Sequence, residues 1–397
     1  MKNQCKISIL LLGFIVAINL IGQGSVLAAT VQPDLKLGSG ASILMEPLSG
    51  EILFQNNPDK KMHPASVTKL MVMLLVLEAI DKNQIKLTDV VTASPEACKM
   101  GGSQIWLEPG EQMTVNELLK AVSIVSANDA SYALGEHIAG SEENFIALMN
   151  KRAQQLGLKN THYVNTTGLE PNSGGEGNLT SVKDMSLLAR EVLKYPMILK
   201  WSGTWIDHLR GGKSFLRNTN KLVRFYRGCD GLKTGFTGEA GYCLVATAKR
   251  DGVRLVAVVM KAETDKQRAQ DVSKLFNYGF SLYKAYEIYK GGEAVGKVRV
   301  FRGHEEYVTA KVARELTAVV KRDDQGTVTK KVRLNPMIQA PVRAGQKIGE
   351  ITLFFQEKTC GKVDLIAATE VKKASIFQIW GDIFKRIISG AVGKVDN

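Results

Sequence analysis

The spacing of apolar residues predicts strands near both ends of a long amino-terminal region and helices in its middle. Short apolar runs on either side of the turn Pro47–Gly50 predict a β-hairpin over residues 39–54. Strand-length apolar runs recur at 244–249 and 255–260. Helical patterns lie between them, at 115–123, 129–138, 142–156 and 181–194. We therefore expect an α+β domain whose sheet is built from distant parts of the chain.

One predicted helix is apolar on nearly every side. It opens at Pro64-Ala65-Ser66 and continues to Ile80 with few polar residues, among them Lys69 in the first turn. A helix of this kind is buried, and burial lowers the pKa of a lysine because desolvation disfavours the charged form. The first turn of a buried helix is therefore an unusual position for a lysine.

The pattern changes after a helix that is predicted to end near Tyr286. Short apolar runs follow, most of them separated by Gly, Asp or Pro, at 297–301, 307–312, 317–320, 327–334 and 347–355. Runs of this length and spacing predict a small all-β domain of roughly 80 residues, which we expect to be a sandwich.

The last segment predicts an amphipathic helix over residues 371–393. Its apolar face consists of Ile376, Phe377, Trp380, Ile383, Phe384, Ile387 and Ile388. Basic residues lie on or beside this face, namely Lys372, Lys373, Lys385 and Arg386. An apolar stripe with basic neighbours is typical of a helix that lies in a membrane interface. A terminal helix docked on its own domain is the alternative, and the basic residues favour the membrane.

The amino terminus has the three regions of an export signal, over residues 1–28. Lys2 and Lys6 precede an apolar run from Ile7 to Ile21, and small residues follow up to Ala28. A permanent membrane anchor would need about 20 unbroken apolar residues, and polar residues break this run early. We expect cleavage near Ala28 and export of the mature chain.

The composition is that of a globular protein, and its net charge favours an anionic partner. Of the 397 residues, 45% are hydrophobic and 23% are charged, which argues against disorder. The 52 Lys plus Arg against 39 Asp plus Glu give a net charge of +13, which favours nucleic acid, acidic lipid or a charged polymer as partner. Export excludes nucleic acid. No Cys/His spacing resembles a zinc site, so we expect no metal and no cofactor.

Four cysteines remain when the signal segment is removed, namely Cys98, Cys229, Cys243 and Cys360. Cys229 and Cys243 lie 14 residues apart around a predicted hairpin, and they could form a disulfide if their strands pair in register. We favour buried free thiols, because Cys commonly serves as a small core residue.

Ser66 and Lys69 are candidates for nucleophilic chemistry. Their spacing of three residues places the hydroxyl and the amine on one face of the helix, within contact range. A neutral amine beside a serine can act as the general base for nucleophilic attack. Taken alone, the pair is better explained by an N-cap serine and a lysine that reaches solvent.

Two further motifs change that interpretation. Ser126-Ala127-Asn128 lies between helical segments, where a hydroxyl and an amide can project into a cleft. Lys233-Thr234-Gly235 lies on a predicted edge strand that leads into the strand at 244–249. Motifs in this order, on helix, loop and strand, match the active-site signature of the penicillin-recognising serine enzymes.

With these motifs the chain resembles the low-molecular-weight penicillin-binding proteins of the D-alanyl-D-alanine carboxypeptidase type. Other segments that carry the resemblance are Gly40 to Ser42, Gly102-Ser103, Gly110-Glu111, Asn218 to Asn220 and Asp230 to Gly235. The resemblance implies a β-lactamase/transpeptidase-like α+β domain over residues 29–286, in which an antiparallel sheet carries a helical subdomain. The all-β sandwich at 287–370 and the amphipathic membrane-anchoring helix at 371–393 would follow.

The resemblance also implies the catalytic roles. Ser66 would be the acylated nucleophile, Lys69 its proton acceptor, and Ser126 the group that relays a proton to the leaving D-alanine. The backbone N–H groups of Ser66 and Phe236 would form the oxyanion hole. Members of the family vary at the position of Phe236, so the resemblance does not define substrate preference at this position.

Substrate binding would fall to other residues by the same resemblance. Asn128 would hold the amide of the substrate. Lys233 and Thr234 would bind its carboxylate, and Arg217 is a candidate for a second carboxylate contact. Gly235 has no side chain, which would let an extended peptide lie beside the strand.

The expected activity is removal of the terminal D-alanine from peptidoglycan stem peptides at the outer face of the cytoplasmic membrane, with β-lactams acylating the same serine. The alternatives are a cross-link-cutting DD-endopeptidase, a β-lactamase and a catalytically inactive wall-binding protein. A class A β-lactamase needs a deacylating glutamate, and Glu170 and Glu176 lack its usual sequence context. The intact motifs argue against an inactive protein.

Overall fold

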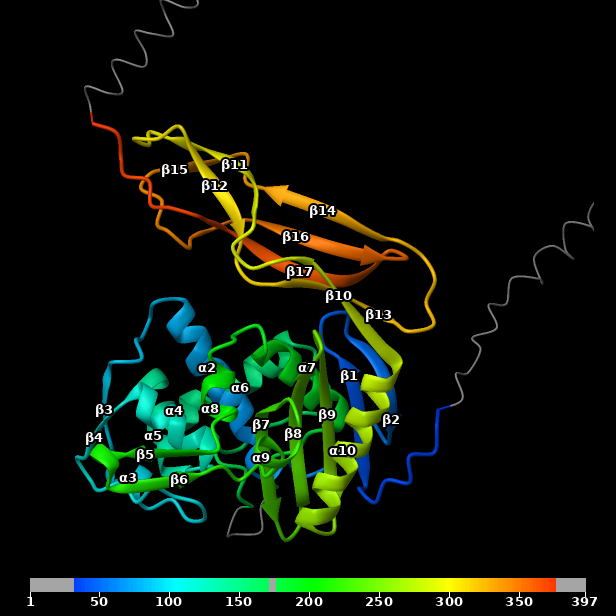
Figure 1. Ribbon diagram of the computed structural model, residues 1–397. Helices are drawn as coiled ribbons and strands as arrows, with labels where there is room; N and C mark the ends of the chain where they lie inside the picture. Colours follow the sequence, from blue (N-terminus) through cyan, green and yellow to red (C-terminus); the bar gives the residue numbers. More distant parts are fainter. Residues whose placement is uncertain (1–31, 171–175, 376–397) are drawn as a thin grey trace, which may run out of the picture. The chain divides into compact units, whose positions relative to one another are not determined.

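The computed structural model describes residues 32–170 and 176–375 (Figure 1). The predicted export signal and residues 376–393 of the predicted terminal helix lie outside these ranges. The described start of that segment, residues 371–375, is not helical, because Val371 and Lys373 form β-bridges with Val342 and Gly303. Within the described part of the chain, no helix has the length and apolar character that a membrane crossing requires.

The amino-terminal domain is built on a five-stranded antiparallel sheet with the order β2-β1-β9-β8-β7. These strands are β1 (Ala41–Glu46), β2 (Glu51–Asn56), β7 (Cys229–Thr237), β8 (Gly241–Arg250) and β9 (Val253–Ala262). The predicted hairpin and the two later predicted strands are confirmed. Because β1 pairs with β9, the start and the end of the domain meet in one sheet, as the pattern predicts.

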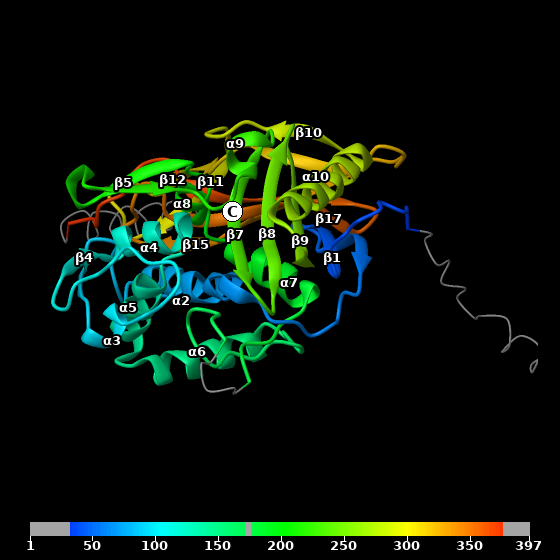
Figure 2. The ribbon, with the colours of Figure 1, turned by 90° about the horizontal axis from the view of Figure 1, so that it is seen from below.

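Helices cover both faces of this sheet. Each predicted helix of the middle region is confirmed, as α4 (Val115–Ile124), α5 (Asn128–Ala139), α6 (Glu142–Gln155) and α7 (Val182–Val192). Helix α10 (Asp265–Leu282) packs on one face, where Gly279 approaches Leu44 and Leu255. The opposite face, with Val256 and Val258, joins the core that the other helices share (Figure 2).

The apolar helix begins as one 3-10 turn, η1 (Ala65–Thr68), and continues as α2 (Lys69–Asp81). Ten of the thirteen residues of α2 are buried, Lys69 included, so the predicted burial is confirmed. Short elements that the pattern did not predict surround this core. They are α3 (Pro95–Cys98), α8 (Ile198–Ser202), α9 (Leu222–Phe225), η2 (Arg210–Gly212), and the strand pairs β3–β4 (Val90–Thr92, Gln112–Thr114) and β5–β6 (Ile206–Leu209, Ser214–Arg217).

The carboxyl-terminal β-domain has two unequal sheets around one core. A two-stranded sheet pairs β10 (Tyr283–Tyr289) with β13 (Leu316–Lys321). A six-stranded sheet has the order β14-β16-β17-β12-β11-β15. Its strands are β11 (Ala294–Phe301), β12 (Tyr307–Val312), β14 (Val328–Leu334), β15 (Met337–Gln339), β16 (Lys347–Phe355) and β17 (Lys358–Ala367). Leu316 and Ala318 of the small sheet pack in the same core as the large one.

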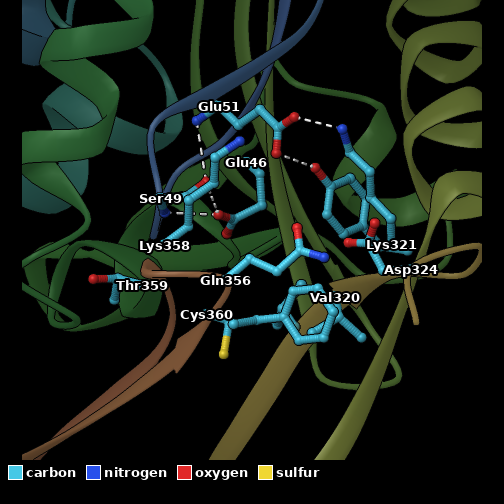
Figure 3. Close-up of a pocket in the computed structure, with 13 residues that line it drawn as sticks. Glu46, Ser49, Glu51, Val320, Lys321, Asp324, Gln356, Lys358, Thr359 and Cys360 are labelled. Atoms are coloured by element: carbon cyan, nitrogen blue, oxygen red, sulfur yellow. Dashed lines mark hydrogen bonds and ion pairs between the residues drawn. The ribbon is translucent and has the colours of Figure 1, made fainter. Parts of the chain in front are cut away.

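The last helix of the amino-terminal domain ends earlier than the sequence predicts. Helix α10 ends at Leu282 instead of near Tyr286, because residues 283–289 pair with β13 as strand β10. At this junction Glu51 accepts hydrogen bonds from Tyr283 Oη at 2.8 Å and from Lys321 Nζ at 2.6 Å (Figure 3). A pocket beside this contact is lined by residues such as Glu46, Lys358 and Cys360. None of the motif residues lines it, so this pocket is not the candidate active site.

All four cysteines in the described part of the chain are free thiols. Cys229 pairs with Ala248 and Cys243 pairs with Gly235, so the two sulfur atoms are not opposite each other in the sheet. Cys229, Cys243 and Cys360 are buried and Cys98 is half-buried. The favoured prediction of free thiols is confirmed.

Candidate active site

Ser66 and Lys69 meet where the 3-10 turn becomes α2. Lys69 Nζ lies 2.9 Å from Ser66 Oγ and donates a hydrogen bond to the carbonyl oxygen of Thr167 at 2.8 Å. Ala65 adopts a φ of +48°, a conformation that residues other than glycine rarely take. Backbone strain of this kind persists where the surrounding structure fixes it, commonly at functional sites. The turn therefore holds the serine hydroxyl against the lysine amine.

Lys69 is fully buried, with 0% of its surface exposed. Desolvation lowers its pKa well below the usual value of 10.5, and the nearby charge of Lys233 lowers it further. The carboxylate of Asp129 acts in the opposite direction and is the smallest of the three causes. The lowered pKa favours the neutral amine, which is the state that can accept the proton of Ser66.

A loop from a distant part of the chain completes the surroundings of Lys69. The side-chain oxygen of Asn165 accepts hydrogen bonds from the N–H groups of Thr167 and Gly168, at 3.1 and 2.7 Å. Gly168 has a φ of +81°, and a Cβ at this position would lie 1.9 Å from the carbonyl oxygen of Ala65. Only glycine allows such an approach. The loop is thus pressed against η1 and brings the Thr167 carbonyl to Lys69.

Ser126 and Asn128 lie at the junction of α4 and α5, as the sequence predicts. Asn128 is fixed by a bond from its N–H to the Ser103 carbonyl at 2.7 Å and from its Nδ2 to the Gly101 carbonyl at 2.6 Å. Ser126 has a φ of +65°. Ser126 Oγ and Asn128 Oδ1 are buried and have no hydrogen-bond partner among the described residues. Buried polar atoms are normally paired, so these two are available to a ligand.

The third motif lies on β7, which is an edge strand of the sheet, as predicted. A Cβ on Gly235 would lie 2.8 Å from the carbonyl oxygen of Pro64 and 3.1 Å from the backbone nitrogen of Ser66. The missing side chain therefore lets the strand approach the serine. Thr234 Oγ1 lies 2.7 Å from Thr219 Oγ1, so its hydroxyl is oriented by a neighbouring hydroxyl.

Lys233 is the second buried amine of the site, with 1% of its surface exposed. Its Nζ donates to the carbonyl oxygen of Thr234 at 2.8 Å. Desolvation, followed by the charge of Arg268, lowers its pKa to about 7. Arg268 of α10 lies behind the strand and donates to the carbonyl oxygens of Gly235 and Cys243, at 3.3 and 3.1 Å.

Phe236 and Arg217 are placed differently from the other predicted residues. The ring of Phe236 is 55% exposed and lies 4.2 Å from the ring of Tyr242, centre to centre. Side chains alternate along a strand, so this ring is on the opposite face from Gly235, and only the backbone of Phe236 continues along the site. Arg217 is exposed on β6, and within the described ranges no hydrogen bond or ion pair joins it to Lys233 or Thr234.

Glu170 is engaged in a structural contact. Its carboxylate accepts a short hydrogen bond from Thr237 Oγ1, two residues beyond Gly235 on β7. This bond joins the end of the 165–170 loop to the strand. Glu176 is exposed. Glu170 is therefore not an unengaged base.

Three residues of the site had no signal in the sequence analysis. Thr167 acts through a backbone carbonyl, which no side-chain motif encodes. Asn165 orders its own loop, and Arg268 reaches the site through strand carbonyls. The run Asn165-Thr166-Thr167-Gly168, in which small polar residues precede a glycine, is a turn signal that could have indicated an ordered loop but not its location.

The described cluster can perform acyl transfer. It contains a hydroxyl beside a buried amine of lowered pKa, a second hydroxyl and an amide oxygen that both lack a partner among the described residues, and a second buried amine. These are the groups that attack on a carbonyl and binding of a carboxylate require.

Two family models match the chain. The model described as D-alanyl-D-alanine carboxypeptidase matches residues 27–264, and the model described as penicillin-binding protein 5, C-terminal domain, matches residues 283–373. The D-alanyl-D-alanine carboxypeptidase DacF of Bacillus subtilis (strain 168) is 43% identical over 338 residues, which cover 84% of this chain and 86% of that protein.

Solved structures are also similar to this chain. Penicillin-binding protein 5 of Haemophilus influenzae is 31% identical, with a TM-score of 0.61 over 85% of this chain and 98% of that one. Penicillin-binding protein D2 of Listeria monocytogenes, in its ampicillin-bound form, is 33% identical, with a TM-score of 0.57 over 62% of this chain and all of that one.

Proposed function

This chain belongs to the D-alanyl-D-alanine carboxypeptidase family, and we propose that it removes the terminal D-alanine of peptidoglycan stem peptides through an acyl-enzyme on Ser66. The observation that carries the proposal is the distance of 2.9 Å between Ser66 Oγ and the buried amine of Lys69. The protein is a serine hydrolase of the low-molecular-weight penicillin-binding type.

Acylation begins with transfer of the Ser66 proton to neutral Lys69. The oxygen then attacks the carbonyl carbon of the penultimate D-alanine, and the backbone N–H of Ser66 and that of Phe236 stabilise the charge on the carbonyl oxygen. The proximity of Gly235 to the Ser66 nitrogen supports this role, because it brings the following N–H of β7 alongside. The bond to the leaving D-alanine breaks when its nitrogen receives a proton through Ser126.

Substrate binding uses the two motifs around this centre. The free carboxylate of the stem peptide pairs with Lys233 and Thr234, and Asn128 holds the peptide amide. The unpaired Asn128 Oδ1 supports its role, because an amide N–H of the substrate would satisfy it. Water then hydrolyses the ester of Ser66, and the free enzyme is restored.

The experiment is location of the acyl group. Incubation with benzylpenicillin and analysis of the digested protein by mass spectrometry should place one adduct on the peptide that contains Ser66. Ser66→Ala should abolish the adduct and the release of D-alanine from a pentapeptide, whereas Ser281→Ala, at an exposed serine, should keep both. An adduct on another serine would refute the assignment. Release of D-alanine from a pentapeptide but no cleavage of a cross-linked dimer would exclude the endopeptidase alternative.

We also propose that the protein is exported and acts at the outer face of the cytoplasmic membrane as a peripheral protein. The signal pattern of residues 1–28 and the amphipathic pattern of residues 371–393 support this location. Deletion after Lys373 should release the protein from the membrane fraction and leave penicillin acylation intact. Retention of the truncated protein on membranes would contradict the anchoring role of the helix.

A further inference from the structure

Three large apolar side chains project from one face of the six-stranded sheet. They are Phe301 of β11, Tyr307 of β12 and Met337 of β15, which are 48%, 51% and 52% exposed. Arg299 pairs with Tyr307 on one side and with Met337 on the other. Residues that pair across strands carry their side chains on the same face, and Phe301 shares that face because it lies two residues beyond Arg299.

The other face of the same strands is the core of the β-domain. Val298, Val300 and Val308 alternate with the exposed residues and are 1–4% exposed. The strands therefore have one buried and one exposed face. The pairing register of the strands places Phe301, Tyr307 and Met337 on the exposed face. A single exposed apolar side chain is common, but several on one surface indicate an interaction site.

Basic groups lie among these apolar side chains. The guanidinium of Arg302 lies 5.1 Å from the centre of the Phe301 ring. Arg299, between Tyr307 and Met337, is also exposed and forms a 3.4 Å ion pair with Glu306. Lys297 and Lys311 lie on the same face by strand alternation. We call Phe301, Tyr307, Met337, Arg299 and Arg302 the outer face of the β-domain.

The described chain ends beside this outer face. The N–H of His304 donates to the carbonyl of Lys372 at 2.8 Å, and the N–H of Ala374 donates to the carbonyl of Arg302 at 2.9 Å. Figure 1 shows the red end of the described chain next to β11 and β15. Exposed Lys372 and Lys373 add positive charge there. The segment with the amphipathic pattern begins at the next residues of the sequence.

We propose that the outer face of the β-domain contacts the membrane directly, with its three apolar side chains among the headgroups of a bilayer that contains anionic lipid. The inference rests on the proposed peripheral location and adds a second contact to that of the terminal segment. Aromatic and thioether groups within a basic border suit the boundary between headgroups and acyl chains. A soluble polyanion would use the basic groups and leave the apolar ones in water, which is why we favour lipid.

The test is binding of the full mature chain to vesicles, measured by sedimentation. The vesicles contain equal parts of phosphatidylglycerol and phosphatidylcholine, and vesicles of phosphatidylcholine alone and soluble polyphosphate are compared. The double variant Phe301→Ser, Tyr307→Ser should bind the anionic vesicles about tenfold more weakly. Met337→Ser is a second variant with a smaller expected loss. All variants should acylate with benzylpenicillin at the normal rate, which verifies folding.

A matched control is Tyr286→Ser. Tyr286 is 50% exposed, lies near a lysine (Lys284 Nζ is 5.6 Å from its ring centre), and belongs to the separate β10–β13 sheet. It should bind anionic vesicles like the unaltered chain. Equal binding by the double variant and the unaltered chain would overturn the outer-face proposal alone, and so would loss confined to polyphosphate. Failure of the unaltered chain to bind any vesicle would overturn the peripheral location as well.

Discussion

The amino-terminal domain buries two lysines beside its serine, whereas the β-domain places its lysines and arginines at or near the surface. Lys69 and Lys233 are 0% and 1% exposed. Among the described residues of the β-domain, no lysine or arginine is buried. The chain has a net charge of +13. Lysine is nevertheless buried at the site of the amino-terminal domain and is not buried in the β-domain.

Burial determines what these amines can do. In the amino-terminal domain, desolvation lowers the pKa values of both lysines, and the charge of Lys233 lowers the pKa of Lys69 further. A neutral amine is a base. On the β-domain, the lysines and arginines are not buried, and salt screens the interactions of charges near the surface. The proposed roles of charge therefore differ, with attraction to a membrane surface in the β-domain and reactivity in the amino-terminal domain. The predictions below vary burial and charge separately.

The largest effect is expected from Lys69. Lys69→Met keeps an unbranched apolar stem in a buried site but removes the base, so acylation by benzylpenicillin should slow about 10³-fold. Lys69→Arg should not restore it, because a guanidinium does not lose its proton. Rates of acylation measured by stopped-flow quenching of fluorescence decide this. Substantial activity in Lys69→Arg would show that a charged group suffices at this position.

The fold could be predicted from the sequence where the hydrophobic pattern was strong. The hairpin, the buried helix and the strands β8 and β9 all have long apolar runs. The end of α10 was misplaced because residues 283–289 adopt strand structure through pairing with β13, a tertiary contact that their own pattern does not encode. The strand pairs β3–β4 and β5–β6 were missed because runs of three or four residues carry little periodicity.

The site could be predicted from the sequence where its side chains form local motifs. Ser66 and Lys69 are three residues apart on one helical turn, so their contact follows from spacing. The carbonyl of Thr167 reaches Lys69 from 98 residues away, and no local pattern predicts such a contact. Arg217 is exposed on β6, and its contact with a substrate carboxylate stays a prediction.

The second largest effect is expected from the close approach of β7. Gly235→Ala adds a Cβ 2.8 Å from the Pro64 carbonyl, so strand and turn must separate. Misplacement of reacting groups by about 1 Å costs about 10²-fold in rate, and we expect that loss of acylation. Gly238→Ala is the matched control, because nothing lies within 4 Å of its Cβ position. A normal acylation rate in Gly235→Ala would mean that the approach is not needed for catalysis.

A smaller effect is expected from pH. With a pKa of about 7, Lys233 loses its charge above neutrality, so kcat/KM for a peptide carboxylate should fall about tenfold per pH unit on the alkaline side. Lys233→Arg keeps its charge, so its profile should lack this alkaline limb although its maximum is lower. An identical limb in Lys233→Arg would assign the titration to another group.

The same pKa has a consequence for stability. The unfolded chain binds a proton at Lys233 up to about pH 10.5, whereas the folded chain releases it above about pH 7. The unfolded state therefore holds more protons between these values, and the free energy of unfolding should rise with pH there, by at most about 1.4 kcal/mol per unit. In Lys233→Met, urea unfolding between pH 7 and 9 should show a shallower rise. An equal slope would contradict the lowered pKa.

The smallest effect is expected from an exposed lysine of the β-domain. Lys330 on β14 donates to Tyr289 Oη at 2.8 Å, and this bond, followed by the charge of Tyr289, raises its pKa. Its charge is fully hydrated and costs nothing to keep, so Lys330→Gln should change the melting temperature by less than about 2 °C and leave acylation unchanged. Lys233→Gln, the same substitution at a buried amine, should lose most of its carboxypeptidase activity. Equal loss of activity in both variants would show that the loss of positive charge lowers activity whether the amine is buried or exposed.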